Sequence, residues 1–154
     1  MLAEYKETND FSRAFTNVTG LDYATYHDRF FINRNEIAKL NELKASPQQV
    51  LTYGEELLKN RASINPYTPF VLPDLVGAAL ELGDVKLAKT YFYELEPLMF
   101  NPSDYLHYAK AFHEANEPEL AQELIEQARA YAVRYAYDLV EFEREVEKTL
   151  GNIE

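Results

Sequence analysis

The sequence predicts an all-α fold in which helical hairpins are stacked and an N-terminal helical segment packs against them. Apolar residues recur every three or four positions through most of the chain, as on one face of a helix. Glycine is scarce, at five of 154 residues, and the seven prolines fall between the periodic segments. No stretch alternates strictly between apolar and polar residues, so a sheet is not expected.

Short helices are predicted within residues 1–31. Phe11 and Phe15 are four positions apart, and Thr19-Gly20 after them marks a helix end. A second set of aromatic residues then repeats at helical spacing: Tyr23, Tyr26, Phe30 and Phe31.

Asn33 begins the next predicted helix. Glu36, three positions later, completes the pattern of a capping box, in which the two side chains bond free amides of the first turn. The helix that follows carries an apolar stripe formed by Ile37, Leu40 and Leu43.

Ser46-Pro47-Gln48-Gln49 is a stronger helix start. The Ser46 hydroxyl can accept from the free amides, and Pro47 has no amide to leave unpaired. We expect this helix to reach about Asn60. Its buried residues should be Val50, Leu51, Leu57 and Leu58.

Residues 63–70 are predicted to interrupt the helices. Pro66 and Pro69 disfavour helix and push the residues before them towards extended backbone. The sequence therefore predicts a division here, with an N-terminal segment at 1–68 and a helical array at 69–154.

Regular start and stop signals follow. Pro73 is expected to open a helix that ends at Leu82, with Gly83 in the left-handed position after it. Asp84 is a favourable N-cap for the next helix, which should run to about Leu98.

The third helix of the array is predicted to start at Asn101-Pro102 and to reach about Ala115. Asn116 can end it, and Pro118 fits the first turn of a fourth helix. Residues 119–150 contain neither proline nor glycine, so two interpretations compete. One is a continuous helix, and the other, which we favour, is a break between about Val133 and Tyr137.

An internal repeat connects these helices. A shift of 33 residues aligns four pairs: Ala88 with Ala121, Phe92 with Ile125, Ala78 with Ala111, and Gly83 with Asn116. A period near 34 residues with two helices per unit is typical of helical repeat arrays, in which each hairpin covers the apolar face of the next.

Residues 69–134 resemble a pair of tetratricopeptide repeats. Ala88 and Ala121 match the small residue that this family places early in the second helix. Phe92 and Ile125 match its large apolar residue one turn later.

The resemblance implies a right-handed superhelix with units at 69–101 and 102–134, closed by a capping helix at 137–150. It also implies a concave face lined by the first helix of each unit. Two departures from the family pattern are Pro97, which is displaced, and Leu95, which replaces a small residue.

The charge distribution is acidic and uneven. The net charge is −11, and residues 70–154 hold seventeen acids and seven bases, a net charge of −10. Such a surface repels nucleic acid and anionic lipid, so neither is an expected partner. No apolar run approaches the roughly 20 residues of a membrane span, and the acidic N-terminus is unlike a signal peptide. We therefore expect a cytoplasmic protein.

Signals for catalysis or metal binding are weak. The chain has no cysteine, and His107 and His113 are six positions apart, on different faces of a helix. Glu117 stands where a metalloprotease motif starting at His113 needs its second histidine. His27, which is followed by Asp28, belongs to no metal-binding or catalytic motif either. The sequence predicts no catalytic residues, no metal site and no cofactor.

These observations favour a non-catalytic adaptor or scaffold that binds a protein or peptide. Because bases are few, a basic or amphipathic helical segment is the expected ligand. Two alternatives are a self-associating assembly domain, for which a homodimer is expected, and a small helical enzyme or enzyme subunit with a pocket between helices. The resemblance places the partner-binding residues on the concave face: Leu80, Glu81, Leu106, Lys110, His113 and Glu114.

Overall fold

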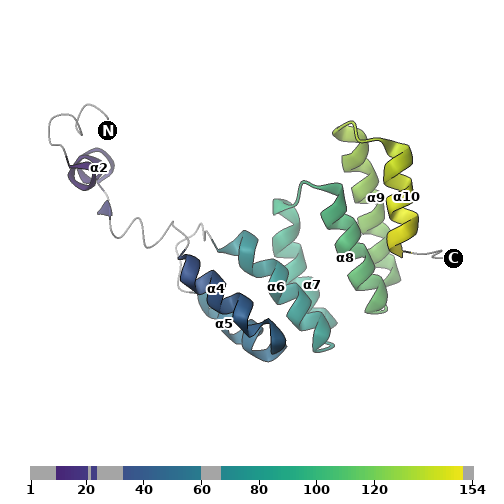
Figure 1. Cartoon of the computed structure of the whole chain (residues 1–154), viewed down its shortest axis with the longest axis horizontal. Helices are drawn as coiled ribbons and strands as arrows, with labels where there is room; N and C mark the ends of the chain where they lie inside the picture. Colours follow the sequence, from purple (N-terminus) through teal and green to yellow (C-terminus); the bar gives the residue numbers. More distant parts are fainter. Residues whose placement is uncertain (1–9, 21, 24–32, 60–66, 151–154) are drawn as a thin grey trace. The chain divides into compact units, whose positions relative to one another are not determined.

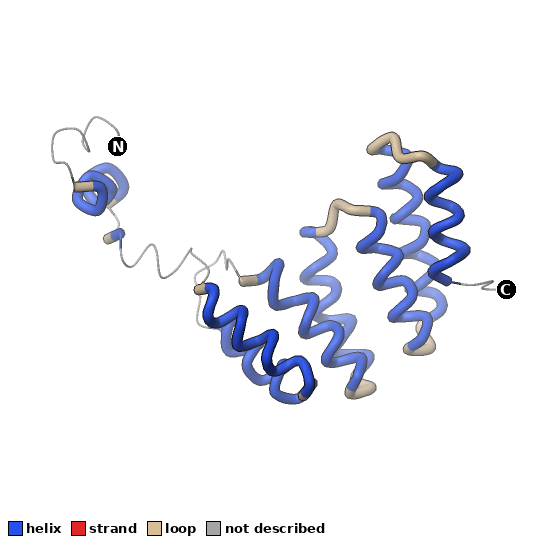
Figure 2. The backbone as a smooth tube through the Cα atoms, in the orientation of Figure 1, coloured by secondary structure: helices blue, strands red, loops and turns tan. Residues whose placement is uncertain are grey.

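The chain was analysed as a computed structural model that describes residues 10–20, 22–23, 33–59 and 67–150. All regular structure in these ranges is helical, and Figure 2 shows helices and loops without a strand. The expected all-α fold is therefore confirmed. None of the described helices combines the length and apolar character needed to cross a membrane.

Figure 1 shows the described helices along the chain. In chain order the elements are α2 (Phe11–Thr19), α4 (Arg34–Glu42), the 3₁₀ turn η1 (Leu43–Ala45), α5 (Pro47–Lys59), α6 (Thr68–Glu81), α7 (Val85–Leu95), the 3₁₀ turn η2 (Glu96–Leu98), α8 (Pro102–Glu114), α9 (Pro118–Arg134) and α10 (Leu139–Leu150).

The chain divides into two compact units, residues 1–78 and 79–154, so the division falls within α6. The sequence-based division between residues 68 and 69 coincides with the start of this helix instead. We describe the two units separately as unit 1 and unit 2.

Unit 1 begins with α2, whose N-cap is Asp10 and whose end is Gly20 in the left-handed conformation. The predicted stop at Thr19-Gly20 is confirmed. Phe15 is buried, and its ring lies 5.4 Å from that of Tyr23. Tyr26, Phe30 and Phe31 lie outside the described residues, as does His27.

The core of unit 1 forms where α5 meets α6. Gly54 permits this approach, because a Cβ atom there would lie 2.7 Å from Leu75 Cδ2 and 3.1 Å from Val71 Cγ1. Val50, Leu51 and Leu57 are buried as predicted, whereas Leu58 is half-buried. The apolar faces of α5 and α6 therefore supply most of this core.

Two predictions about α6 are wrong. Residues 68–70 are helical, and α6 continues through Pro73 instead of starting there. Pro69 lies in the first turn, where a helix needs no amide bond, and Pro73 costs only the bond to the carbonyl of residue 69. Burial of neighbours such as Leu72 and Val76, both fully buried, outweighs that loss.

The start of α4 also differs from the prediction. Asn33 is its N-cap and accepts from the amide of Asn35 at 3.0 Å. The second half of the expected capping box is replaced by Tyr67, which is fully buried. The Asn33 amide donates to the Tyr67 hydroxyl at 2.6 Å, and that hydroxyl donates to Glu36 Oε2.

Unit 2 consists of the end of α6 and helices α7 to α10. Phe92 of α7 is fully buried, and its ring lies 5.2 Å from the rings of Tyr108 and Phe112 in α8. Helix α8 packs along α9, and α10 packs against both. Phe142 and Val146 are the residues by which α10 joins this core.

Three turns of unit 2 share one backbone geometry. Gly83, Asn116 and Ala136 have φ values of 73°, 62° and 55°, in the left-handed region. In each turn the next amide donates to the carbonyl five positions earlier, at 2.9 Å, as in a Schellman motif. The expected ends at Gly83 and Asn116 are confirmed, and Ala136 confirms the break between α9 and α10.

The predicted N-caps of unit 2 are also confirmed. Asp84 accepts from the amide of Leu87 at 3.0 Å, and Asn101 accepts from that of Ser103 at 3.0 Å. Helix α7 ends at Leu95, three residues earlier than predicted, and continues as η2 because Pro97 cannot extend the α-helical pattern.

Candidate binding surface

The exposed side of α8 is the first candidate surface. Ser103, His107, Lys110 and Glu114 are exposed and are spaced by four, three and four positions, so they form one line along the helix. We call these four residues the α8 stripe. His113 is exposed beside it.

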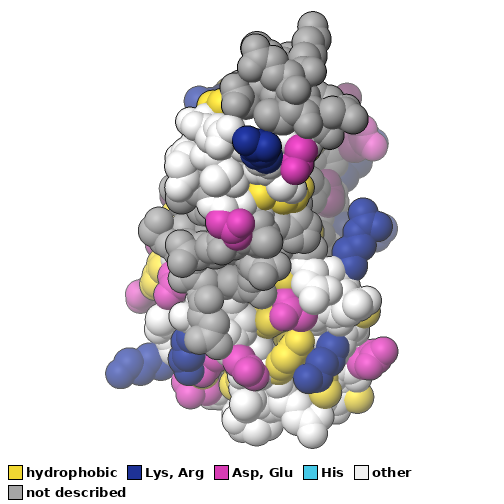
Figure 3. All heavy atoms as spheres, turned by 90° about the vertical axis from the view of Figure 1, so that its left-hand side faces the viewer, with side chains coloured by type: hydrophobic (Ala, Val, Ile, Leu, Met, Phe, Trp, Pro, Cys, Tyr) yellow, Lys and Arg dark blue, Asp and Glu magenta, His cyan; other side chains and the backbone are white. Residues whose placement is uncertain are grey.

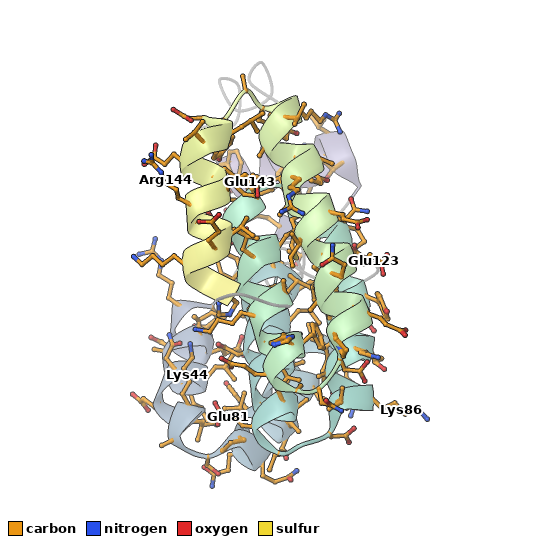
Figure 4. The ribbon with its side chains drawn as sticks, turned by 90° about the vertical axis from the view of Figure 1, so that its right-hand side faces the viewer. Lys44, Glu81, Lys86, Glu123, Glu143 and Arg144 are labelled. Carbon is orange, nitrogen blue, oxygen red and sulfur yellow. The ribbon has the colours of Figure 1, made fainter. Side chains whose placement is uncertain are left out.

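The predicted contact residues divide into two groups. Lys110, His113 and Glu114 lie on one turn of α8 and are exposed. Leu80, half-buried, and Glu81, exposed and labelled in Figure 4, belong to the end of α6. These five side chains stay predicted contact residues.

Leu106 is a correction to the predicted surface. Only 2% of its side chain surface is exposed, so it belongs to the core of unit 2 and offers no contact to a partner. The resemblance to tetratricopeptide repeats placed it on the concave face, with the other residues of the first helix.

The ion pair within the α8 stripe is weak enough for a charged ligand to replace one of its members. Lys110 Nζ lies 3.9 Å from Glu114 Oε1, and both side chains are more than half exposed. Ion pairs at this exposure contribute less than about 1 kcal/mol. A charged partner can therefore replace either side chain in the pair at little cost.

Stronger ion pairs hold the helices of unit 2 together. Arg129 donates twice to Glu143 at 2.9 Å, which joins α9 to α10 and lowers the pKa of the Glu143 carboxyl. Lys89 contacts Glu117 at 2.5 Å, linking α7 to the residue before α9. Figure 4 shows Glu143 between α9 and α10, whereas Arg144 points away from α9.

Glu123 of α9 lies near another carboxylate of unit 2. Figure 4 shows Glu123 on the side of α9 that faces away from α10. Burial raises the pKa of Glu96, and the charge of Glu123 adds to this effect. Carboxylates from η2 and α9 therefore lie near one another in unit 2. Figure 3 shows acidic and basic side chains mixed on the face turned towards the viewer.

A second surface was missed by the sequence reasoning. It lies at the end of unit 2 that carries the α7–α8 and α9–α10 turns, both uppermost in Figure 1. Six large apolar side chains there are between 46% and 73% exposed: Phe100, Val133, Tyr135, Tyr137, Leu139 and Val140. We call these six residues the apolar end. The signal in the sequence was their position beside turns, where an apolar stripe has no helix to cover it.

Within the described residues, His, Asp and Glu side chains nowhere form a group of three that could hold a metal ion. His107 and His113 are both exposed on α8.

Comparison of the chain with protein-family models, with curated proteins and with solved structures finds no match. The similarity to tetratricopeptide repeats therefore depends on the residue pattern. The all-helical fold and the equivalent turns at Gly83 and Asn116 are compatible with a helical repeat.

Proposed function

We propose that this chain is a non-catalytic binding module, an adaptor or scaffold, whose TPR-like hairpins hold a basic or amphipathic segment of another protein. The proposal is supported above all by the α8 stripe, an exposed polar line within a region of net charge −10. A cytoplasmic location is part of this proposal.

Several features of the repeat support a TPR-like arrangement. Ala88 and Ala121, which align at a shift of 33 residues, are 0% and 1% exposed. Their large partners one turn later, Phe92 and Ile125, are buried as well. Equivalent positions therefore have equivalent environments, as expected when each hairpin covers its neighbour. In such an array the first helix of a unit, here α8, lines the binding face.

The charge balance supports a basic ligand. Bases are few in residues 70–154, and Lys110 is the one lysine or arginine among the predicted contact residues. Carboxylates at Glu81 and Glu114 are exposed on the same proposed face. Charge complementarity of this kind speeds association and selects partners, and salt screens it.

The test uses charge reversal on the α8 stripe. The probe is a synthetic amphipathic peptide of about five helical turns, with leucine on one face and lysine on the other. Glu114→Lys should weaken its binding about three- to tenfold by replacing an attraction with a repulsion, whereas Lys110→Glu, one turn away, should strengthen it. Fluorescence anisotropy at low and high salt measures both effects.

A peptide with glutamate in place of lysine is the matched control and should not bind. Equal binding of the two peptides, or no binding of either, would contradict the proposed function. Sedimentation velocity on the same samples tests the alternative of a self-associating domain, which predicts a concentration-dependent dimer without any ligand.

A further inference from the structure

The apolar end is built differently from the opposite end of unit 2. The two opposite turns, at residues 82–84 and 115–117, expose one large apolar side chain, Leu82. Clustered exposure of large apolar side chains is unfavourable in water and is typical of contact sites. The apolar end is therefore the better candidate for a contact site of the two ends.

A row of stacked tyrosine rings leads to this surface. Tyr105 is buried, its ring stacks on that of Tyr131 at 5.1 Å, and Tyr131 stacks on Tyr135 at 5.9 Å. Tyr135 is 52% exposed, so the row runs from the core to the surface. A ring already held by its neighbours loses little conformational entropy when a ligand covers it.

The α9–α10 turn contains a strained backbone residue between two exposed tyrosines. Ala136 has φ 55°, although an alanine Cβ is unfavourable in the left-handed region, where the other two turns use glycine and asparagine. The strained residue stands between Tyr135 and Tyr137, both exposed. Strain of this kind is typical of functional segments.

Carboxylates lie beside the α9–α10 turn and near the tyrosine row. Asp138 accepts from the amides of Val140 and Glu141 at 2.9 and 3.1 Å, which fixes its carboxylate within the turn. Burial raises the pKa of Tyr105, and Glu96 and Asp104 add to the rise, so their charges lie near the inner end of the tyrosine row. Arg134 is the one base in residues 131–141, and it lies over the Tyr135 ring at 5.7 Å.

We infer that the apolar end anchors the apolar side chains of a cationic amphipathic helix, whose lysines or arginines face Asp104, Asp138 and Glu141. The inference rests on the proposed function and adds the site at which the ligand is anchored. A second copy of this chain is a poorer occupant, because it would bring another region of net charge −10 to the same carboxylates.

The experiment compares two leucines of equal exposure. Leu139, at the apolar end, and Leu82, at the opposite end, are each 46% exposed. Leu139→Ser and Phe100→Ser should each weaken the leucine–lysine peptide about tenfold, since each removes part of an apolar anchor. Leu82→Ser should leave the affinity unchanged. Thermal unfolding checks that all three variants stay folded.

The possible outcomes separate this inference from the proposed function. If Glu114→Lys weakens the peptide but the variants of the apolar end do not, the inference is overturned and the proposed function stands. If the wild-type chain does not bind the peptide, both fail. An equal loss in Leu82→Ser, or a dimer that Phe100→Ser dissociates in sedimentation equilibrium, would also overturn the inference.

Discussion

The α8–α9 turn and the α9–α10 turn have the same backbone and opposite side chains. Asn116 and Ala136 are both left-handed, and each is followed by an amide that bonds the carbonyl five positions earlier at 2.9 Å. The first turn reads Ala-Asn-Glu and the second Tyr-Ala-Tyr. The same turn geometry is therefore compatible with very different exposed residues.

The largest effect on the free energy of unfolding is expected from the buried residue four positions before each turn. Phe112 precedes Asn116 by four positions, and Ala132 precedes Ala136 by four; both are fully buried. Phe112→Ala should lower the free energy of unfolding by about 3–5 kcal/mol, because its ring packs on Phe92 at 5.2 Å. Urea denaturation measures the change.

His113→Ala, next to Phe112 but exposed, is the matched control and should change stability by less than about 0.5 kcal/mol. A similar loss in both variants would contradict this prediction, because the exposed side chain would then matter as much as the buried ring.

An intermediate effect is expected from glycine in the left-handed positions. Ala136→Gly should raise the free energy of unfolding by about 0.5–1 kcal/mol, because relief of the Cβ strain exceeds the entropy that glycine adds to the unfolded chain. Asn116→Gly should change it by a few tenths at most, since asparagine already tolerates this conformation. Differential scanning calorimetry on the two variants gives the comparison.

Gly83→Ala completes the set and should destabilise by about 1 kcal/mol. If Ala136→Gly gives no gain in melting temperature, alanine is not strained in this turn, and one support for the anchoring role of the apolar end is lost.

The smallest effect concerns the ion pair beside the α9–α10 turn. The hydrogen bonds from Arg129 lower the pKa of Glu143, so the native state binds fewer protons than the unfolded state. This stabilisation is present above the ordinary carboxyl pKa of about 4.3 and is lost as the pH falls through the lowered value. Glu143→Gln should therefore cost less than about 1 kcal/mol at pH 7 and nothing in strong acid.

Urea denaturation across the acid range measures this difference, with Glu147→Gln on the same helix as the control. A cost that does not fade in acid would show that the pair acts through packing of the side chains and not through charge.

Local signals in the sequence predicted most helix boundaries of unit 2. Asp84, Asn101 and Asn116 act through bonds to residues at most five positions away, so their roles can be read from neighbouring residues. Ala136 carries no such signal, because alanine has no side-chain acceptor and is unfavourable in the left-handed region. The break expected between Val133 and Tyr137 is confirmed, but its exact position came from the backbone.

Features that depend on distant residues were not predictable in this way. Pro73 continues α6 because the helix buries its neighbours, which outweighs the local preference for a break. Leu106 matches a position on the concave face of the repeat family, but it is buried here. The apolar end was missed for the same reason, because the exposure of its side chains depends on how the helices pack and not on neighbouring residues in the sequence.

The hydroxyl of Tyr67 has a consequence for how unit 1 assembles. It completes the first turn of α4 by bonding both Asn33 and Glu36, although it is more than thirty positions later in the chain. The beginning of α4 is therefore finished only after the start of α6 has docked. A fragment that ends at Lys59 should show a frayed α4, and in the complete chain the two helices should gain protection from hydrogen exchange together, as one cooperative event.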